Sequence, residues 1–142
     1  MNAQGQLQAS MVKQIVINSH PDQLPEVEQF IELIRSELEF KDDVFGNVMV
    51  AVTEAVNNSI HHGNSMEQAK RVFISCEMVS SFRIVVSVKD EGKGFDPEAL
   101  PDPTAPENLE NPGGRGVFLM RHLSDSIEFD EGGRLVRMFF NI

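Results

Sequence analysis

Two side chains that could act on one substrate stand four residues apart in the segment 43–64. Glu54 is a carboxylate that could accept a proton, and Asn58 carries an amide oxygen that could bind a hard cation. In a helix, residues four apart lie one turn above each other on the same face. Glu54 is the only Asp, Glu, Lys or Arg between residues 44 and 64. This sparse charge favours a face reserved for a ligand, and the alternative is an ordinary exposed polar face.

Two glycine clusters further along the chain could hold a nucleotide. Asp90 opens the cluster Asp-Glu-Gly-Lys-Gly after an expected strand, and an aspartate there can accept a hydrogen bond from an exocyclic amine such as that of adenine. Gly114, Arg115 and Gly116 precede an expected helix, where backbone N–H groups can bind phosphates. Neither cluster is a Walker loop or a dinucleotide fingerprint. Each is weak evidence by itself, because glycine turns are common.

Hydrophobic periodicity predicts the helix that would carry the first pair. The segment 43–64 reads as one long amphipathic helix, with Asn47, Ala51 and His61 beside Glu54 and Asn58 on its polar side. The opposite, apolar stripe, which we expect to pack on a core, consists of Phe45, Val48, Met49, Val52, Val56 and Ile60.

The other segments predict a sheet beside this helix. We expect strands at 12–18, 71–78, 83–89, 126–129 and 135–141, and further helices at 22–39 and 117–123. Strands 71–78 and 83–89 should form one hairpin, and the two last strands should form another around Glu131-Gly-Gly. This order predicts an α+β fold, a two-layer α/β sandwich with a mostly antiparallel mixed sheet covered on one face by helices.

The length of 142 residues predicts one domain, at 11–142, after a loose N-terminal segment at 1–10. The stretch 95–112 contains five of the seven prolines, five acidic residues and no Lys or Arg. Because glycine clusters flank it, we expect a lid over a ligand at about residues 95–113. A disordered insertion is the alternative.

Composition limits the class of protein. The net charge of −10 argues against a general nucleic-acid or anionic-membrane surface, and an acidic chain that binds a polyphosphate would need Mg²⁺ and backbone N–H groups. The apolar runs are too short to span a membrane, and no signal pattern opens the chain, so we expect a cytoplasmic protein. The single cysteine, Cys76, is expected to be a core residue.

The three motifs, in this order, resemble a known set. Glu-x-x-x-Asn on a helix, Asp-x-Gly-x-Gly after a strand and Gly-x-Gly before a helix resemble the N box and the two glycine boxes of the Bergerat-type ATP-binding fold. Type II topoisomerases, large heat-shock chaperones, histidine kinases and mismatch-repair ATPases share this histidine-kinase-like fold. The resemblance covers about residues 47–142. TEAVNNSIHHGN and GGRGVFLMRHLSDSIEF are most similar to the anti-sigma factor serine kinases, single-domain bacterial proteins that phosphorylate a serine of an anti-anti-sigma partner.

The resemblance implies a role for each matching residue. Glu54 matches the catalytic carboxylate, Asn58 the ligand of the Mg²⁺ that bridges the ATP phosphates, and Asp90 the adenine-reading aspartate. The matching glycines are Gly92 and Gly94 at the base pocket and Gly114 and Gly116 in the lid near the phosphates.

Some residues depart from the pattern or stay open. Arg115 stands where family members often carry an apolar residue, and it could meet the γ-phosphate or pair with an acidic lid residue. Lys93 could reach a phosphate, although an exposed turn lysine is the simpler interpretation. His61 and His62 are expected to pack at the helix end rather than bind a metal, since no further ligand stands at a suitable spacing.

The resemblance therefore implies an ATP- and Mg²⁺-dependent protein serine kinase that acts as an anti-sigma regulator. Its implied partner is an anti-anti-sigma protein, with a sigma factor and a second copy of the chain as further candidates, and without direct contact to nucleic acid or membrane. The alternative is a nucleotide-controlled protein-binding switch without significant turnover. A nucleotide-free interaction domain is a third hypothesis. Glu54 favours the kinase, because a pure binder does not need a carboxylate there.

Overall fold

The computed structural model describes residues 10–94 and 115–142. The expected loose segment 1–10 lies outside the described residues except for Ser10, which opens a strand. The expected lid at about 95–113 also lies outside them.

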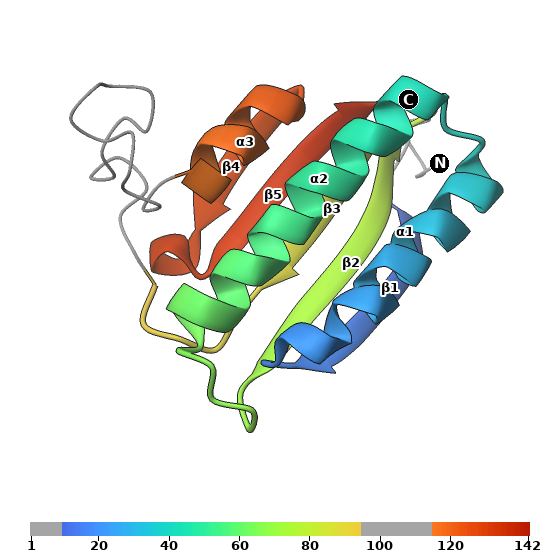
Figure 1. Ribbon diagram of the computed structural model, residues 1–142. Coiled ribbons are helices and arrows are strands. Elements are labelled where there is room, and N and C mark those ends of the chain that lie inside the picture. The colour runs from blue at the N-terminus through green and yellow to red at the C-terminus, as the bar shows by residue number, and fades with distance from the viewer. Residues whose placement is uncertain (1–9, 95–114) are drawn as a thin grey trace.

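The elements follow the predicted order (Figure 1). The strands are β1 (Ser10–Asn18), β2 (Arg71–Ser80), β3 (Arg83–Lys89), β4 (Ser126–Asp130) and β5 (Leu135–Asn141). The α-helices are α1 (Leu24–Leu38), α2 (Asp42–Asn58) and α3 (Arg115–Leu123). Short helical turns are η1 (Pro21–Gln23), η2 (Ser59–Gly63) and η5 (Glu131–Gly133).

The five described strands form one sheet in the order β1-β2-β3-β5-β4. All four pairings between them are antiparallel. The three α-helices lie on the same face of this sheet, with α2 between α1 and α3 (Figure 1). The expected α+β sandwich with a mostly antiparallel sheet is therefore confirmed, and no parallel pair occurs among the described strands.

The core lies between the sheet and the helices. Alternate side chains of β2, β3 and β5 point toward the helices, which is the period of two expected for a sheet with one covered face. Of the predicted stripe on α2, Val48, Val52 and Val56 are fully buried and Phe45 and Met49 are partly buried. None of the described helices is long and apolar enough to cross a membrane.

Cys76 lies in this core on β2, as expected. Burial, together with the nearby carboxylates of Glu77 and Glu37, raises the pKa of its thiol to about 12. The thiol therefore stays protonated at physiological pH and packs as a small apolar group.

The helix predicted at 43–64 does not keep α-helical geometry to its end. It changes at Ser59 into a single π-helical turn, η2, in which the N–H of Asn64 donates to the carbonyl of Ser59 at 2.7 Å. Such wide turns inside helices are frequent at functional sites. Here the wide turn directs the chain from the end of α2 toward the loop that follows β3.

Candidate active site

Glu54 and Asn58 lie on α2 and are both half-buried. The first turn of α3 lies against Asn58, since a Cβ atom added to Gly116 would stand 2.9 Å from its side-chain nitrogen. Only glycine permits this approach between the two helices without a shift of the amide. The structure therefore brings together the predicted pair on α2 and one predicted glycine at the start of α3.

The neighbouring position Ala51 differs from the expectation. It was predicted on the polar side of the helix beside Glu54, but it is 0% exposed. The reason is tertiary, because α3 lies alongside α2 on this side (Figure 1). The polar side of α2 is thus partly covered by α3 near Ala51 and Asn58, whereas Asn47 and His61 on the same side are exposed.

Asp90 follows the end of β3 directly, as expected, and only 5% of its surface is exposed. Its N–H donates to the carbonyl of Arg134 at 3.0 Å, and its Oδ1 accepts the N–H of Gly92 at 2.8 Å. Burial raises the pKa of the Asp90 carboxyl, while the N–H of Gly92, the hydroxyl of Ser59 and the cations Arg134 and Lys70 act in the opposite direction. This carboxylate lacks much of its hydration, so a hydrogen-bond donor on a ligand would find a strong acceptor there.

Close backbone contacts join the Asp90 loop to η2. A Cβ atom on Gly63 would lie 2.3 Å from a carboxylate oxygen of Asp90, and one on Gly92 would lie 1.7 Å from the carbonyl oxygen of Gly63. Gly94 has φ of +83°, and a Cβ there would lie 2.0 Å from the carbonyl oxygen of Gly132. The two predicted glycines are required by their surroundings, because neither site has room for a side chain.

Sequence reasoning missed Gly63 and Ser59 as parts of this site. From the sequence alone, Gly63 indicates only the end of the predicted helix, and nothing in the pattern distinguishes Ser59. The available signal was their position, since both follow Asn58 within five residues of the same segment. Their contact with Asp90 depends on long-range packing that the spacing of residues does not reveal.

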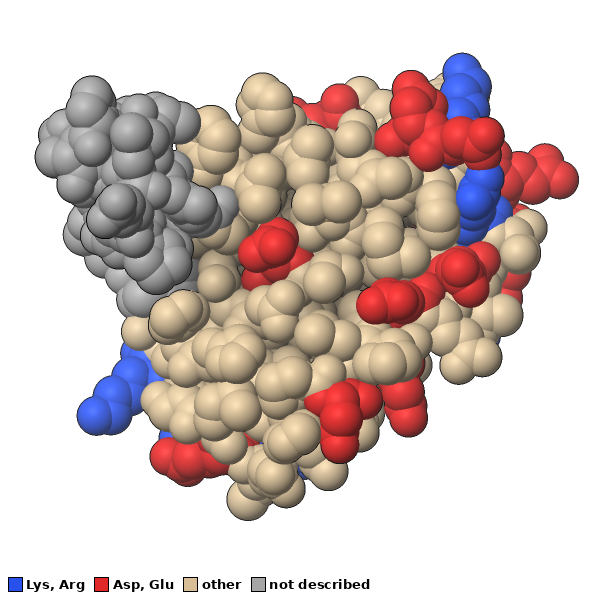
Figure 2. Space-filling model, viewed as in Figure 1, with Lys and Arg blue, Asp and Glu red and all other residues tan. Residues whose placement is uncertain are grey.

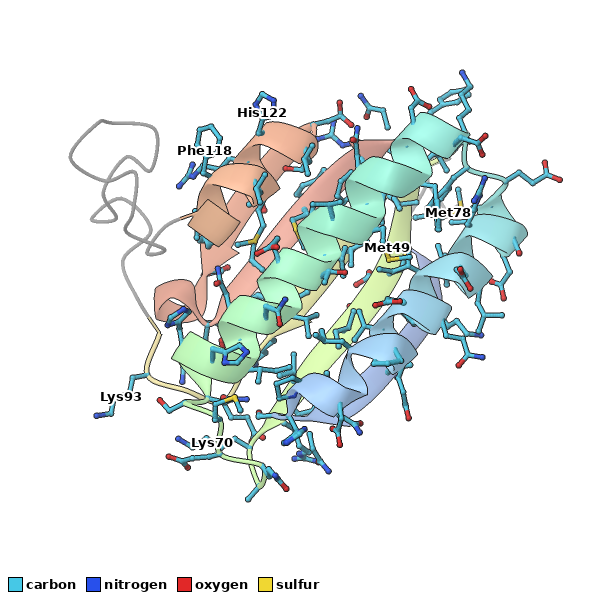
Figure 3. The ribbon with its side chains drawn as sticks, viewed as in Figure 1. Met49, Lys70, Met78, Lys93, Phe118 and His122 are labelled. Carbon is cyan, nitrogen blue, oxygen red and sulfur yellow. The ribbon has the colours of Figure 1, made fainter. Side chains whose placement is uncertain are left out.

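The remaining predicted residues are placed as follows. Gly114 lies outside the described residues, and Arg115 is the first residue of α3 with its side chain outside the described part. Lys93 is exposed, and Figure 3 shows it and Lys70 at the same end of the molecule.

The histidines at the end of the segment do not pack as expected. His61 and His62 are both exposed, because the π-helical turn leaves them on the outside, so the packing prediction is wrong. Within residues 10–94 and 115–142, no group of three or more His, Cys, Asp or Glu side chains could hold a metal ion. A cation at this site would therefore depend on few protein ligands.

The charge around the helices is sparse. Figure 2 shows the helix-covered face, on which the described Lys and Arg side chains lie mainly at the margins and acidic side chains stand singly or in small groups. A phosphate bound near the start of α3 would have no dense cluster of described cations beside it. Backbone N–H groups and a bound cation would have to supply the compensating charge.

Comparison with known proteins agrees with this geometry. The family model for the histidine kinase-like ATPase domain matches residues 17–140, which extend from the end of β1 to the end of β5. The matched part therefore contains the α2 pair, the Asp90 loop and the start of α3.

The similar individual proteins are anti-sigma factors and serine-protein kinases. An anti-sigma F factor of Heyndrickxia coagulans is 35% identical over 104 residues, which cover 68% of this chain and 69% of the relative. The serine-protein kinase RsbW of Staphylococcus epidermidis is 28% identical over 130 residues, covering 81% of each chain. That of Listeria monocytogenes is 26% identical over 129 residues, covering 80% of this chain and 82% of the relative. The chain belongs to the histidine kinase-like ATPase domain family and, within it, to the anti-sigma factor serine kinases.

Proposed function

We propose that this protein is an ATP-dependent protein serine kinase that acts as an anti-sigma regulator by phosphorylating a serine of an anti-anti-sigma partner. The observation that carries the proposal is the convergence of three motifs at one end of α2. Asn58 meets Gly116 at the start of α3, and η2, which continues α2, packs against the Asp90 loop. A base, a phosphate chain and an attacking hydroxyl could thus be held along one surface.

Asp90 is assigned to the adenine base. Its carboxylate is buried and its remaining lone pairs could accept a hydrogen bond from the exocyclic amine. The glycines at 63, 92 and 94 let the Asp90 loop pack closely on η2 and η5, and this packing holds the carboxylate in place. A carboxylate held in this way could serve as a fixed acceptor for the base.

The phosphates are assigned to the start of α3 and to Asn58. The N–H groups of the first residues of α3 have no partner within the helix, and the helix dipole favours an anion there. Asn58 would be the protein ligand of Mg²⁺, which fits its hard amide oxygen and the usual binding of Mg²⁺ by few side chains plus substrate phosphates. When bound, the ion would neutralise charge that develops on the phosphates.

Glu54 is assigned as the catalytic base. It would take the proton of the substrate serine as the serine oxygen forms a bond to the γ-phosphorus and the bond between that phosphorus and the β,γ-bridging oxygen breaks, so that ADP leaves. Glu54 lies one turn before Asn58, and this closeness supports a catalytic base next to the proposed phosphate-binding residues.

The partners and setting follow from the same proposal. An anti-anti-sigma protein is the substrate, a sigma factor is a second candidate ligand, and a homodimer is a candidate assembly. We also propose that the protein works in the cytoplasm. The alternative function, a nucleotide-controlled binding switch without significant turnover, would use Asp90 and Asn58 in the same way but would not require the base at Glu54.

The test is transfer of phosphate to a protein. The purified chain is incubated with Mg²⁺, ATP labelled at the γ-phosphate and candidate anti-anti-sigma proteins, and the label is located by peptide mass spectrometry. We expect a single phosphoserine in one candidate and equimolar ADP. Nucleotide binding without transfer to any candidate would favour the switch, and no nucleotide binding would contradict both.

A further inference from the structure

A completely buried polar side chain lies just beyond the proposed site. Asn64 follows η2 and is 0% exposed. Its side-chain Nδ2 donates to the hydroxyl of Ser19 at 2.8 Å and to the carbonyl of Arg71 at 3.0 Å, and its Oδ1 accepts the N–H of Glu91 at 2.8 Å. Both amide protons and the amide oxygen are therefore used.

These bonds join the segment after η2 to three other segments of the chain. Ser19 follows β1, Arg71 begins β2, and Glu91 lies in the loop after β3. The hydroxyl of Ser19 continues the network by donating to the carbonyl of Lys70 at 2.6 Å. Asn64 is thus the one described side chain that hydrogen-bonds to β1's end, β2's start and the Asp90 loop at once.

The contact with Glu91 completes the support of the Asp90 loop. Three successive N–H groups of this loop have different acceptors: the Asp90 N–H uses the carbonyl of Arg134, the Glu91 N–H uses Asn64, and the Gly92 N–H uses the Asp90 carboxylate. The middle bond is the only one of the three that ties the loop to the segment after η2. It fixes the peptide that links Asp90 to Glu91, and so the direction of the Asp90 side chain.

Other residue types would not serve this position. Alanine would leave the Glu91 N–H and the Arg71 carbonyl without their partner, and an aspartate would place an acceptor against that carbonyl and against the Ser19 hydroxyl that already donates elsewhere. Only an amide offers two donors and one acceptor in this arrangement.

We propose that Asn64 is a positioning residue of the nucleotide site: by holding the Glu91 N–H, it keeps the Asp90 carboxylate aimed at the base. This inference rests on the proposed function, since it assigns the base to Asp90. Asn64 itself would not touch the nucleotide. Its loss should therefore weaken binding of every ligand that contains the base, and should leave phosphoryl transfer from bound ATP unchanged.

The test compares Asn64→Ala with Ser19→Ala. Ser19→Ala removes two hydrogen bonds of the same network but keeps the bond between Asn64 and Glu91, so it is a matched control for loss of stability. We expect Asn64→Ala to weaken adenosine, ADP and ATP by the same factor of about five to ten in titration calorimetry, and Ser19→Ala to change them by less than about twofold. In the kinase assay, KM for ATP should rise in Asn64→Ala while kcat stays within about twofold.

A double-mutant cycle separates positioning from general structure. If Asn64 acts through Asp90, Asn64→Ala should cause little further loss of affinity when Asp90→Asn is already present. Additive losses, or equal losses in Asn64→Ala and Ser19→Ala, would overturn the inference and leave the proposed function standing. Absence of adenosine and ATP binding by the unmodified chain would instead overturn the proposed function and this inference with it.

Hydrogen exchange keeps the inference testable if Asn64→Ala does not fold. In the unmodified protein the Glu91 amide, although it lies on an exposed residue, should exchange slowly, and saturation with adenosine should slow it further. Exchange at the rate of an open loop, with no response to adenosine, would contradict the role given to Asn64.

Discussion

The carboxylate of Asp90 is kept in a place where its charge is poorly hydrated. Burial raises its pKa, and only part of this effect is offset by the Gly92 N–H, the Ser59 hydroxyl and two cations. A group in this state gains more from a ligand donor than an exposed aspartate would, because most of its water has already been removed. In the proposed recognition of the base, the desolvation of the Asp90 carboxylate has therefore largely taken place on folding, before the ligand binds.

We predict that Asp90→Asn weakens ATP and ADP equally, by roughly ten- to a hundredfold, since loss of a charged hydrogen bond is worth about 1.5–3 kcal/mol. The equality follows because a residue aimed at the base does not sense the γ-phosphate. Calorimetry with both nucleotides measures the two factors. Unchanged affinity for both would remove Asp90 from the site.

The raised pKa of Asp90 also predicts how binding and stability depend on pH. In the proposed site the ionised carboxylate would accept the adenine amine, so ATP affinity should fall as pH drops through the raised pKa, at a higher pH than for an ordinary aspartate. In the pH range between the Asp90 pKa of the unfolded chain and the higher pKa of the folded chain, the folded chain holds more protons. The contribution of Asp90 to the free energy of unfolding therefore falls as pH rises through this range. At neutral pH, Asp90→Asn should thus unfold no more easily than the unmodified chain, and its affinity should lose this pH dependence. Identical affinity profiles for both proteins would contradict the assignment.

Asn58 is predicted to act only when phosphates and Mg²⁺ are present. Asn58→Ala should weaken Mg²⁺-dependent ATP binding by about tenfold and leave adenosine binding within about twofold, because only the phosphates need the cation. Titrations of ATP with and without Mg²⁺, and of adenosine, provide the comparison. An equal loss in all three would mean that Asn58 is structural, holding α3 through its contact with Gly116.

At the scale of elements, η2 and the Asp90 loop pack so closely that a methyl group added at Gly63 should push them apart. Gly63→Ala would place a Cβ 2.3 Å from the Asp90 carboxylate, and we expect a loss of about 1–3 kcal/mol in the free energy of unfolding, together with weaker adenosine binding. Gly46→Ala, earlier in the same segment, is the matched control.

Gly46 lies within α2 with nothing within 4 Å of an added Cβ. Alanine there should raise the free energy of unfolding by about 0.5–1 kcal/mol, because it is the better helix former. Urea denaturation of both variants tests the pair. A Gly63→Ala protein as stable as Gly46→Ala would show that the loop does not need this close contact.

The elements themselves were largely predictable, and the exceptions have physical causes. Period-two and helical patterns located every described strand and α-helix in the correct order, because one covered sheet face and one buried helix face leave clear periodicities. The patterns could not show that α2 gives way to a π-helical turn at Ser59. Nor could they show that Ala51 is buried under α3. Both depend on contacts between segments far apart in the chain.

At the scale of the whole molecule, the sheet and its helices bring three motifs from separate parts of the sequence to one end of α2. The motif order predicted the family, which the match over residues 17–140 shows. The network around Asn64 was not predictable in this way, since Ser19, Arg71 and Glu91 carry no shared spacing and meet only through the strand order. The motifs thus predict candidate binding residues, and the fold shows which neighbouring side chains contact them.

The central claim, that this chain is a kinase and not only a nucleotide switch, depends on Glu54. Glu54→Gln keeps the shape of the side chain but removes its basicity, so it should lower the rate of transfer more than the affinity. Glu32→Gln, an exposed change on α1, is the matched control for loss of one negative charge.

The most direct measurement is single-turnover transfer from γ-labelled ATP to the anti-anti-sigma partner, made with ATP and partner both saturating. We predict that Glu54→Gln binds ATP and partner within about twofold of the unmodified chain but transfers phosphate about 10²- to 10⁴-fold more slowly, while Glu32→Gln transfers at the normal rate. Transfer by Glu54→Gln at the unmodified rate would contradict the account.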